Sequence, residues 1–196
     1  GFDTVQRRFG QVQKFGFGHA TLHGLDQTVI LIVKSPTALF PAAALLARGV
    51  ACRAPVSGAV YGTLLNDRAA LQALGDAVHA APYKAPPKAP VLYLKPRNTF
   101  AGHRARVVVP DNALGVEVGA SLGIVIGRTA SRVGAGEAFD YIAGYTLVAD
   151  LSVPHASVYR PSVRFRARDG FCVIGPAVVA ARHVAAPDDL GIKVAD

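Results

Sequence analysis

The segment that most constrains the fold runs from Val116 to Ile126 and overlaps the stretch "VGASLGIVIG", residues 118–127. Its valines and isoleucines favour a β-strand over a helix. Side chains on a strand alternate between its two faces. One face carries the small or polar residues Glu117, Gly119, Ser121 and Gly123. The other face is apolar, so we expect it to pack on a core, whereas the small polar face suits a cavity wall or the close approach of another backbone segment.

The same segment also matches the G-x-S-x-G spacing of a serine-hydrolase nucleophile elbow, with Ser121 at its centre. An elbow needs a strand, a sharp turn and then a helix. The residues after Ser121 read Leu-Gly-Ile-Val-Ile-Gly, which favours a continuing strand. Triad partners are available downstream (Asp150, His155 and His183), but their spacing selects none of them. We therefore place Ser121 inside a strand and not at a catalytic elbow.

Short β-branched or aromatic runs between glycines and prolines predict further strands. These strands are expected at residues 28–33, 60–65, 91–94, 107–109, 146–153, 163–166 and 171–173. Helices are expected at residues 38–48, 67–81 and 137–145, the last with Gly144 near its end. Many short strands with few helices predict a β-rich α+β fold. A change of composition near residue 54 predicts an N-terminal extension of unknown role, residues 1–54, and a main domain, residues 55–196.

The charge of the chain is basic, because 21 Lys and Arg face 13 Asp and Glu and give a net charge of +8. These basic residues are scattered and do not interleave with aromatic residues on a strand, so we expect no nucleic-acid binding. A small anionic substrate accounts for the same charge. The turn after residue 94 carries Lys95 and Arg97, which could bind such an anion or could simply be solvated cations.

The two cysteines, Cys52 and Cys172, lie far apart and form no C-x-x-C pattern, which excludes a zinc ribbon. A reduced, cytoplasmic setting is the expectation for such a chain. The longest apolar run near the N-terminus falls well short of the ~20 residues of a membrane span, so we expect no membrane association.

Several ordered motifs resemble the fumarylacetoacetate hydrolase superfamily. They are "PYKAPPKAPVLYLKPRNT", "VEVGASLGIVIGRTA", "EAFDYIAGYTLVADLSVP" and "YRPSVRFRARDGF". The resemblance runs from about Pro55 to Lys193 and is strongest to the isomerase/decarboxylases of 4-hydroxyphenylacetate (homoprotocatechuate) degradation. It implies a mixed-sheet β-roll and Mg²⁺- or Mn²⁺-dependent chemistry on small oxo-acids. The family's final third would follow residue 196, so we expect a C-terminally incomplete roll whose open sheet edges favour a homodimer or a complex with a homologous subunit.

The resemblance also bears on metal binding. The family binds its metal with an Asp, which is Asp150 here, and with a Glu-x-Glu pair, whose positions are held here by Gly119 and Ser121. Glu117 is a candidate replacement on the same face. Two residues along a strand span ~6.6 Å, whereas a metal–oxygen bond is ~2.0–2.6 Å, so Glu117 would need a register shift. Asp150 is therefore either a remnant metal ligand or a structural turn residue, and Mg²⁺ or Mn²⁺ could bind only weakly with help from substrate.

Further site residues follow from the resemblance alone. Catalytic roles are implied for Asp150 and Arg166, and substrate-binding roles for Lys95, Tyr159, Arg160 and Asp169. Arg166 replaces a family lysine three residues before Asp169; arginine can grip a carboxylate through two nitrogens but cannot shuttle a proton. The family's lid near the first helix brings a histidine, whereas "LLNDRAAL", residues 64–71, keeps Asn66 and has no histidine.

Two functions are compatible with the sequence. The first is an isomerase/decarboxylase component that acts on a muconate-type oxo-dicarboxylic acid, with Lys95, Arg160 and Arg166 binding the anion. The resembled enzymes consist of two homologous halves, one of which lacks the glutamates, and this chain resembles that half. The second function is a catalytically silent subunit that supports a metal-binding homologue.

Overall fold

The computed structural model describes residues 51–65, 68–89, 91–155, 162–187 and 190–192, together with three short strands nearer the N-terminus. Those strands are β1 (Thr4–Gln6), β2 (Val12–Lys14) and β3 (Val29–Val33). The helix expected at residues 38–48 lies outside the described residues. The strand expected at residues 28–33 is confirmed as β3.

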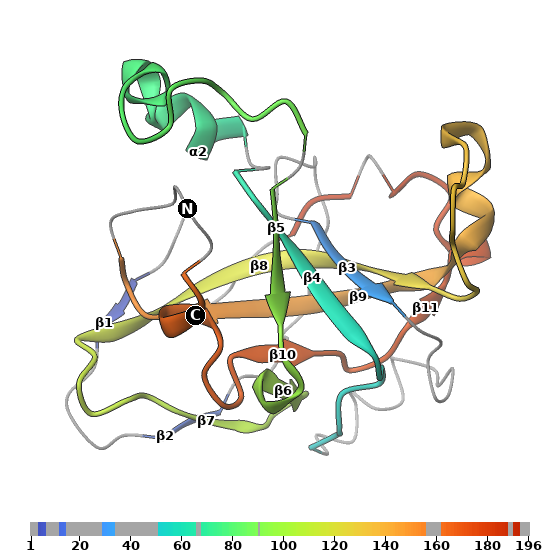
Figure 1. The fold of residues 1–196 in the computed structure, drawn as a ribbon. Coiled ribbons are helices and arrows are strands. Elements are labelled where there is room, and N and C mark those ends of the chain that lie inside the picture. Colours follow the sequence, from blue (N-terminus) through green and yellow to red (C-terminus); the bar gives the residue numbers. More distant parts are fainter. Residues whose placement is uncertain are drawn as a thin grey trace.

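Nine strands form a single mixed sheet in the order β5-β4-β3-β8-β9-β10-β6, with β1 paired to β8 and β11 paired to β9 (Figure 1). Their bounds are β4 (Ala59–Leu64), β5 (Val91–Lys95), β6 (Phe100–Gly102), β8 (Gly115–Ile126), β9 (Ile142–Ser152), β10 (Cys172–Ile174) and β11 (Val179–Ala180). The pairs β3–β8 and β10–β6 are parallel and the others are antiparallel. Strand β7 (Arg106–Val108) pairs with β2 in a separate two-stranded sheet.

The two longest strands, β8 and β9, form the antiparallel centre of the sheet. Their register places Gly119 opposite Asp150 and Ser121 opposite Val148. Ser121 lies in the interior of β8 and is 1% exposed, which confirms its placement in a strand. The elbow geometry of a serine hydrolase is absent at this position.

Both faces of this centre carry apolar clusters. One contains Val56, Val60, Val125, Val148, Cys172, Ile174 and Val178. The other contains Val107, Val116, Ala149, Leu151, Val153, Phe171 and Val173. Val116 packs in the second cluster, as the apolar face of β8 predicts. The opposite face of β8, which carries the small and polar residues, also packs on a core near the C-terminal end of the strand, because Val125 belongs to the first cluster.

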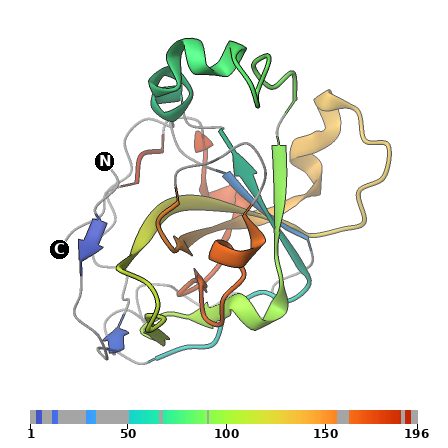
Figure 2. The same cartoon turned by 60° about the vertical axis from the view of Figure 1, so that its left-hand side comes forward.

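The sheet is rolled, so that strand β5 returns over β9. Strands β4, β3 and β8 lie between β5 and β9 in the sheet, yet the Lys95 Nζ atom is 3.1 Å from the Leu151 carbonyl oxygen. Figures 1 and 2 show β4 and β5 crossing the direction of β8 and β9. Within the described strands the roll does not close into a barrel, because its end strands β5 and β6 are not paired with each other. The expected mixed-sheet, strand-rich fold is confirmed.

Two predicted elements are wrong. The helix expected at 137–145 is a 3₁₀ helix, η3 (Ala135–Tyr141), followed at once by β9. Gly144 is not a helix cap; a Cβ atom there would overlap the Val179 carbonyl oxygen, so glycine permits the close approach of β11. The strand expected at 163–166 is a short helix, α3 (Val163–Arg166). Its apolar–basic alternation imitates a strand, but the amides of Phe165 and Arg166 both donate to the Ser162 carbonyl.

The helix expected at residues 67–81 is split in the described region. Helix α2 (Arg68–Ala73) is followed by a 3₁₀ helix, η1 (Gly75–His79), and Gly75 has a φ of +48°. A left-handed residue cannot continue an α-helix, which explains the break. No helix among the described residues has both the length and the hydrophobicity needed to cross a membrane.

Candidate functional site

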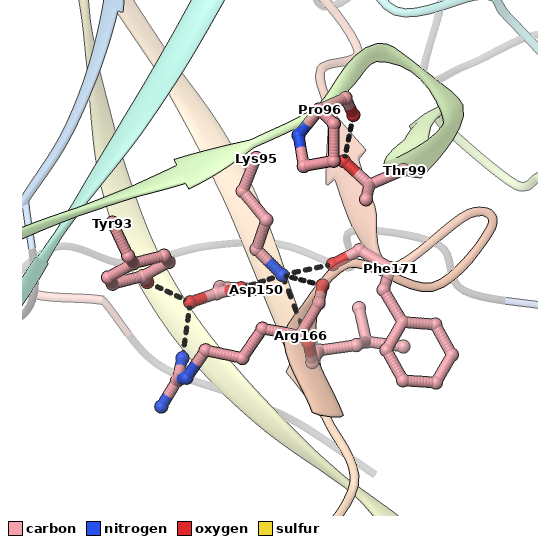
Figure 3. Close-up of polar contacts among 8 residues, drawn as sticks. Tyr93, Lys95, Pro96, Thr99, Asp150, Arg166 and Phe171 are labelled. Atoms are coloured by element: carbon pink, nitrogen blue, oxygen red, sulfur yellow. Dashed lines mark hydrogen bonds and ion pairs between the residues drawn. The ribbon is translucent and has the colours of Figure 1, made fainter. Parts of the chain in front are cut away.

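Asp150 is the centre of a buried polar cluster on the inner face of the roll (Figure 3). It lies on β9 opposite Gly119 and is 4% exposed. Its carboxylate accepts a hydrogen bond from the Tyr93 hydroxyl, contacts the Lys95 ammonium and accepts a hydrogen bond of 3.0 Å from Arg166 Nη1. Three strands or helices that are distant in sequence therefore meet at a single carboxylate.

Lys95 is the most deeply buried charge of the cluster, at 1% exposure. Its Nζ atom donates to three main-chain carbonyls: Leu151 at 3.1 Å, Arg166 at 2.9 Å and Phe171 at 3.0 Å. Together with Asp150 these oxygens satisfy a charge that would otherwise be costly to bury.

The turn after Lys95 ends strand β5 and holds the lysine in place. Pro96 precedes a 3₁₀ turn, η2 (Arg97–Thr99), in which both the amide and the hydroxyl of Thr99 donate to the Pro96 carbonyl, at 2.9 Å and 2.6 Å. Arg97 is exposed in this turn, whereas Lys95 points inward. Of the two basic residues, only Lys95 therefore belongs to the cluster.

Tyr93 lies two residues before Lys95 and shares its face of β5. Gly62 stands opposite on β4, and a Cβ atom there would overlap the Tyr93 ring. The Arg166 guanidinium carbon lies 4.9 Å from the centre of the ring, within cation–π range. Burial and, next, the Asp150 carboxylate raise the pKa of Tyr93 well above 10, so the phenol stays a proton donor.

The cluster opens to solvent through Arg166. Its side chain is 17% exposed, whereas those of Tyr93, Lys95 and Asp150 are nearly inaccessible. Its Nε atom is buried without a hydrogen-bond partner, and so is the Oγ atom of Ser121. Asp150 Oδ1 faces the Lys95 ammonium as an ion pair without an aligned hydrogen bond. Arg166 is therefore the member that an incoming ligand would contact first.

Cys172 borders the cluster on β10, opposite Asp150. Burial raises the pKa of this thiol to about 12; the Lys95 charge acts to lower it and the Asp150 charge to raise it. Cys172 is therefore a neutral thiol at ordinary pH and packs as a small apolar residue in the first core cluster.

The structure brings together three of the residues predicted from sequence: Asp150, Lys95 and Arg166. Asp169 is exposed and accepts a hydrogen bond of 2.7 Å from Asn98, so it joins two loops outside the cluster. Tyr159 and Arg160 lie outside the described residues, as does Asn66.

Tyr93 is the member of the cluster that the sequence reading missed. The signal was present, because residues two apart on a strand face the same way, and Lys95 was already a candidate. Tyr93 could thus have been found from Lys95 alone.

The donor set does not fit a divalent metal. Among the residues the structure describes, no three His, Cys, Asp or Glu side chains lie together as a metal site. Gly119 and Ser121 supply no carboxylate, and Glu117 pairs with Ser152, two residues along the strands from the Gly119–Asp150 pair. The Asp150 carboxylate is already held by a phenol, an ammonium and a guanidinium.

Comparisons with known proteins match the chain to one protein family. The model of the fumarylacetoacetate (FAA) hydrolase C-terminal family matches residues 59–195. The 4-hydroxyphenylacetate degradation bifunctional isomerase/decarboxylase of Escherichia coli is 42% identical over 123 residues, which are 63% of this chain and 28% of that protein. The protein of the same name from Salmonella dublin is 41% identical over 120 residues, 61% of this chain and 28% of that protein. The chain thus spans less than a third of the length of either relative.

A solved structure, 5-carboxymethyl-2-hydroxymuconate delta-isomerase from Mycobacterium smegmatis, is 24% identical with a TM-score of 0.43. The similarity covers 81% of this chain and 46% of that chain.

Proposed function

Because the chain belongs to the fumarylacetoacetate hydrolase family, we propose that it is a component of an isomerase/decarboxylase of 4-hydroxyphenylacetate catabolism. The substrate that we propose is a muconate-type oxo-dicarboxylic acid. The names of the similar proteins support this class of reaction. The observation that carries the proposal is the buried Asp150 between Lys95 and Arg166, at the position where the sequence resemblance places the family's aspartate.

Arg166 is the proposed binding group for one substrate carboxylate. Its guanidinium uses Nη1 for Asp150, and its side chain is the part-exposed member of the cluster, at 17%. A guanidinium offers five donors in a fixed fork, and a carboxylate can bind two of them at once. The same residue can therefore hold Asp150 and an anionic ligand together.

Isomerisation of an oxo-acid moves a proton and shifts a double bond, with no net gain or loss of atoms. Such a transfer needs a base and a group that stabilises the enolate. We assign Asp150 as the base and Arg166, the part-exposed cation, as the positive charge beside the enolate oxygen, while the buried Lys95 holds the Asp150 carboxylate in place. Tyr93 would orient the carboxylate through its hydrogen bond.

The first experiment is calorimetric titration of the protein with a 2-oxo-dicarboxylate. We expect Arg166→Ala to weaken binding at least tenfold. Arg164→Ala is the matched control, because Arg164 lies on the same helix and is exposed, and its guanidinium lies 5.5 Å from the centre of the Phe165 ring and not at Asp150. Equal affinities in the wild-type protein and Arg166→Ala would contradict the proposed binding site.

A second function, a silent subunit that supports a metal-binding homologue, is favoured by a different observation. The three hydrogen bonds of Lys95 Nζ and its ion pair with Asp150 tie β5 to β9, α3 and the residue before β10, as a structural brace would. In that case Arg166→Ala should leave the activity of a complex with the homologue unchanged. A clear loss of turnover in that complex would exclude the silent role.

We also propose that the protein acts as a homodimer or in a complex with a homologous subunit. Strand β5 ends the order of the described sheet, and its outward side chains Leu92 and Leu94 are about half exposed. Unpaired edge strands with apolar side chains favour association. Size-exclusion chromatography with light-scattering detection would give the molecular mass of the protein in solution. A monomer at every protein concentration would exclude the homodimer.

A further inference from the structure

We propose that the oxygens around Lys95 form a cation site that the lysine ammonium fills, so that the protein carries its own fixed cation at the Asp150 cluster and takes up no divalent metal there. The site itself is independent of the proposed function. Only its consequence, turnover without added metal, rests on that function.

The ligands are those of a cation site. Three main-chain carbonyls and one carboxylate surround a single nitrogen, and they come from the end of β9, the end of α3 and the residue before β10 (Figure 3). Carbonyl and carboxylate oxygens are the ligands of hard cations. The carbonyl distances of 2.9–3.1 Å suit an ammonium, whereas Mg²⁺ demands ~2.0–2.1 Å.

The backbone holds these carbonyls independently of the lysine. The Leu151 amide donates to the Phe171 carbonyl at 3.0 Å, and the Val153 amide donates to the Phe165 carbonyl at 3.0 Å. These two bonds fix β9 to the residue before β10 and to α3. The Arg166 carbonyl is at the last residue of α3, where helix carbonyls lack a partner within the helix. The oxygens therefore stay together when the ammonium is removed.

The charges of the cluster argue against a second cation. One carboxylate faces the Lys95 ammonium and the Arg166 guanidinium, which leaves a net charge of +1. A divalent ion on Asp150 would raise this to +3 in a buried setting, where like charges repel strongly. The two neighbouring positions that could have supplied compensating carboxylates are Gly119 and Ser121.

The first test uses the wild-type protein and Mn²⁺. After dialysis against a chelator, we expect no binding of Mn²⁺ at submillimolar concentration by electron paramagnetic resonance, and a melting temperature that changes by less than about 1 °C when Mn²⁺ is added. Submillimolar Mn²⁺ binding that is lost in Asp150→Asn would overturn the proposal.

The second test removes the ammonium. In Lys95→Ala we expect methylammonium or K⁺ to raise the melting temperature by roughly 5 °C or more, with no such rise in the wild-type protein or in the control Lys88→Ala, an exposed lysine. If Lys95→Ala folds but no monovalent cation stabilises it, the site does not exist. If it fails to fold, recovery of folded protein in methylammonium supports the site, and failure in every cation overturns it.

Turnover separates this inference from the proposed function. If the oxo-acid is converted equally with and without chelator, both stand. If conversion requires Mn²⁺, the built-in cation is wrong and the proposed function stands. If no conversion occurs under any condition, the proposed function fails, whereas the cation site is still decided by Mn²⁺ binding and by the rescue of Lys95→Ala.

Discussion

Tyr93 and Asp150 are joined by a hydrogen bond although β4, β3 and β8 separate their strands in the sheet. The contact exists because the sheet rolls until β5 lies over β9. Lys95 makes the same crossing from the next inward position of β5. The polar cluster and the roll of the sheet therefore depend on each other. We expect substitutions in the cluster to lower the free energy of unfolding of the whole sheet.

Removing the Tyr93 hydroxyl should destabilise the protein. In Tyr93→Phe the carboxylate loses a hydrogen bond, and bonds to charged groups contribute about 1.5–3 kcal/mol. We expect the free energy of unfolding in urea to fall by about that amount. Tyr61→Phe is the control on the neighbouring strand, where the half-buried tyrosine has an outward position, and it should cost much less. Equal losses in the two variants would show that the bond to Asp150 contributes nothing.

The sequence predicts the positions of the strands, but it does not predict which of their side chains come into contact. Residues 116–126 and 146–153 were identified as strands because β-branched runs bounded by glycine leave few alternatives. The convergence of Lys95 on Asp150 depends on how the sheet rolls, which local patterns do not encode. Lys95 is a candidate from its place at a strand end and Asp150 from the family resemblance, but neither line of argument predicts that the two meet, and Tyr93 was missed.

The error at residues 163–166 comes from the shortness of the segment. The Val-Arg-Phe-Arg segment of α3 alternates like a strand, but four residues carry too little periodicity to distinguish the two states. Packing decides the outcome, because Phe165 contacts the second core cluster and its carbonyl accepts a hydrogen bond from the Val153 amide.

Gly62 should not tolerate a larger residue. In Gly62→Ala the added methyl group would overlap the Tyr93 ring, which is held by Asp150 and Arg166 and cannot move without losing those contacts. Overpacking of this kind costs about 1–3 kcal/mol. Gly136→Ala is the control, because a Cβ atom there meets no atom within 4 Å. Urea unfolding of both variants measures the difference, and a neutral Gly62→Ala would mean that the Tyr93 ring is free to shift.

Cys172 should resist alkylation in the folded protein. With a pKa of about 12, roughly one thiol in 10,000 is ionised at pH 8, and the thiolate is the reactive form. We expect iodoacetamide to label the half-buried Cys52 first and to label Cys172 only after unfolding in urea. Mass spectrometry of the labelled peptides separates the two sites. Rapid labelling of Cys172 under native conditions would contradict its buried position beside Asp150.

Lys95 and Asp150 should show strong coupling. Asp150→Asn leaves the buried Lys95 and the half-buried Arg166 without their counter-charge, and breaking a buried pair costs about 3–5 kcal/mol. Adding Lys95→Met removes one of those cations, so the double variant should be less destabilised than the sum of the single variants, by about 0.5–3 kcal/mol. A complete double-mutant cycle in urea gives this coupling energy. Strict additivity would mean that the two groups do not interact.

His103 should make the stability of the fold depend on pH. Burial, and then the nearby Arg104 charge, lower the pKa of His103 below its usual 6.5. The unfolded chain therefore takes up a proton on His103 more readily than the folded protein does. The contribution of His103 to the stability of the folded state is full above about pH 6.5, and it is lost as the pH falls through the pKa of the folded protein. We expect the free energy of unfolding to decrease from pH 7.5 to 5.5, by at most ~1.4 kcal/mol per pH unit for this proton. His103→Gln should flatten that slope, whereas His183→Gln, at an exposed position, should not. An unchanged slope in His103→Gln would assign the pH dependence to other groups.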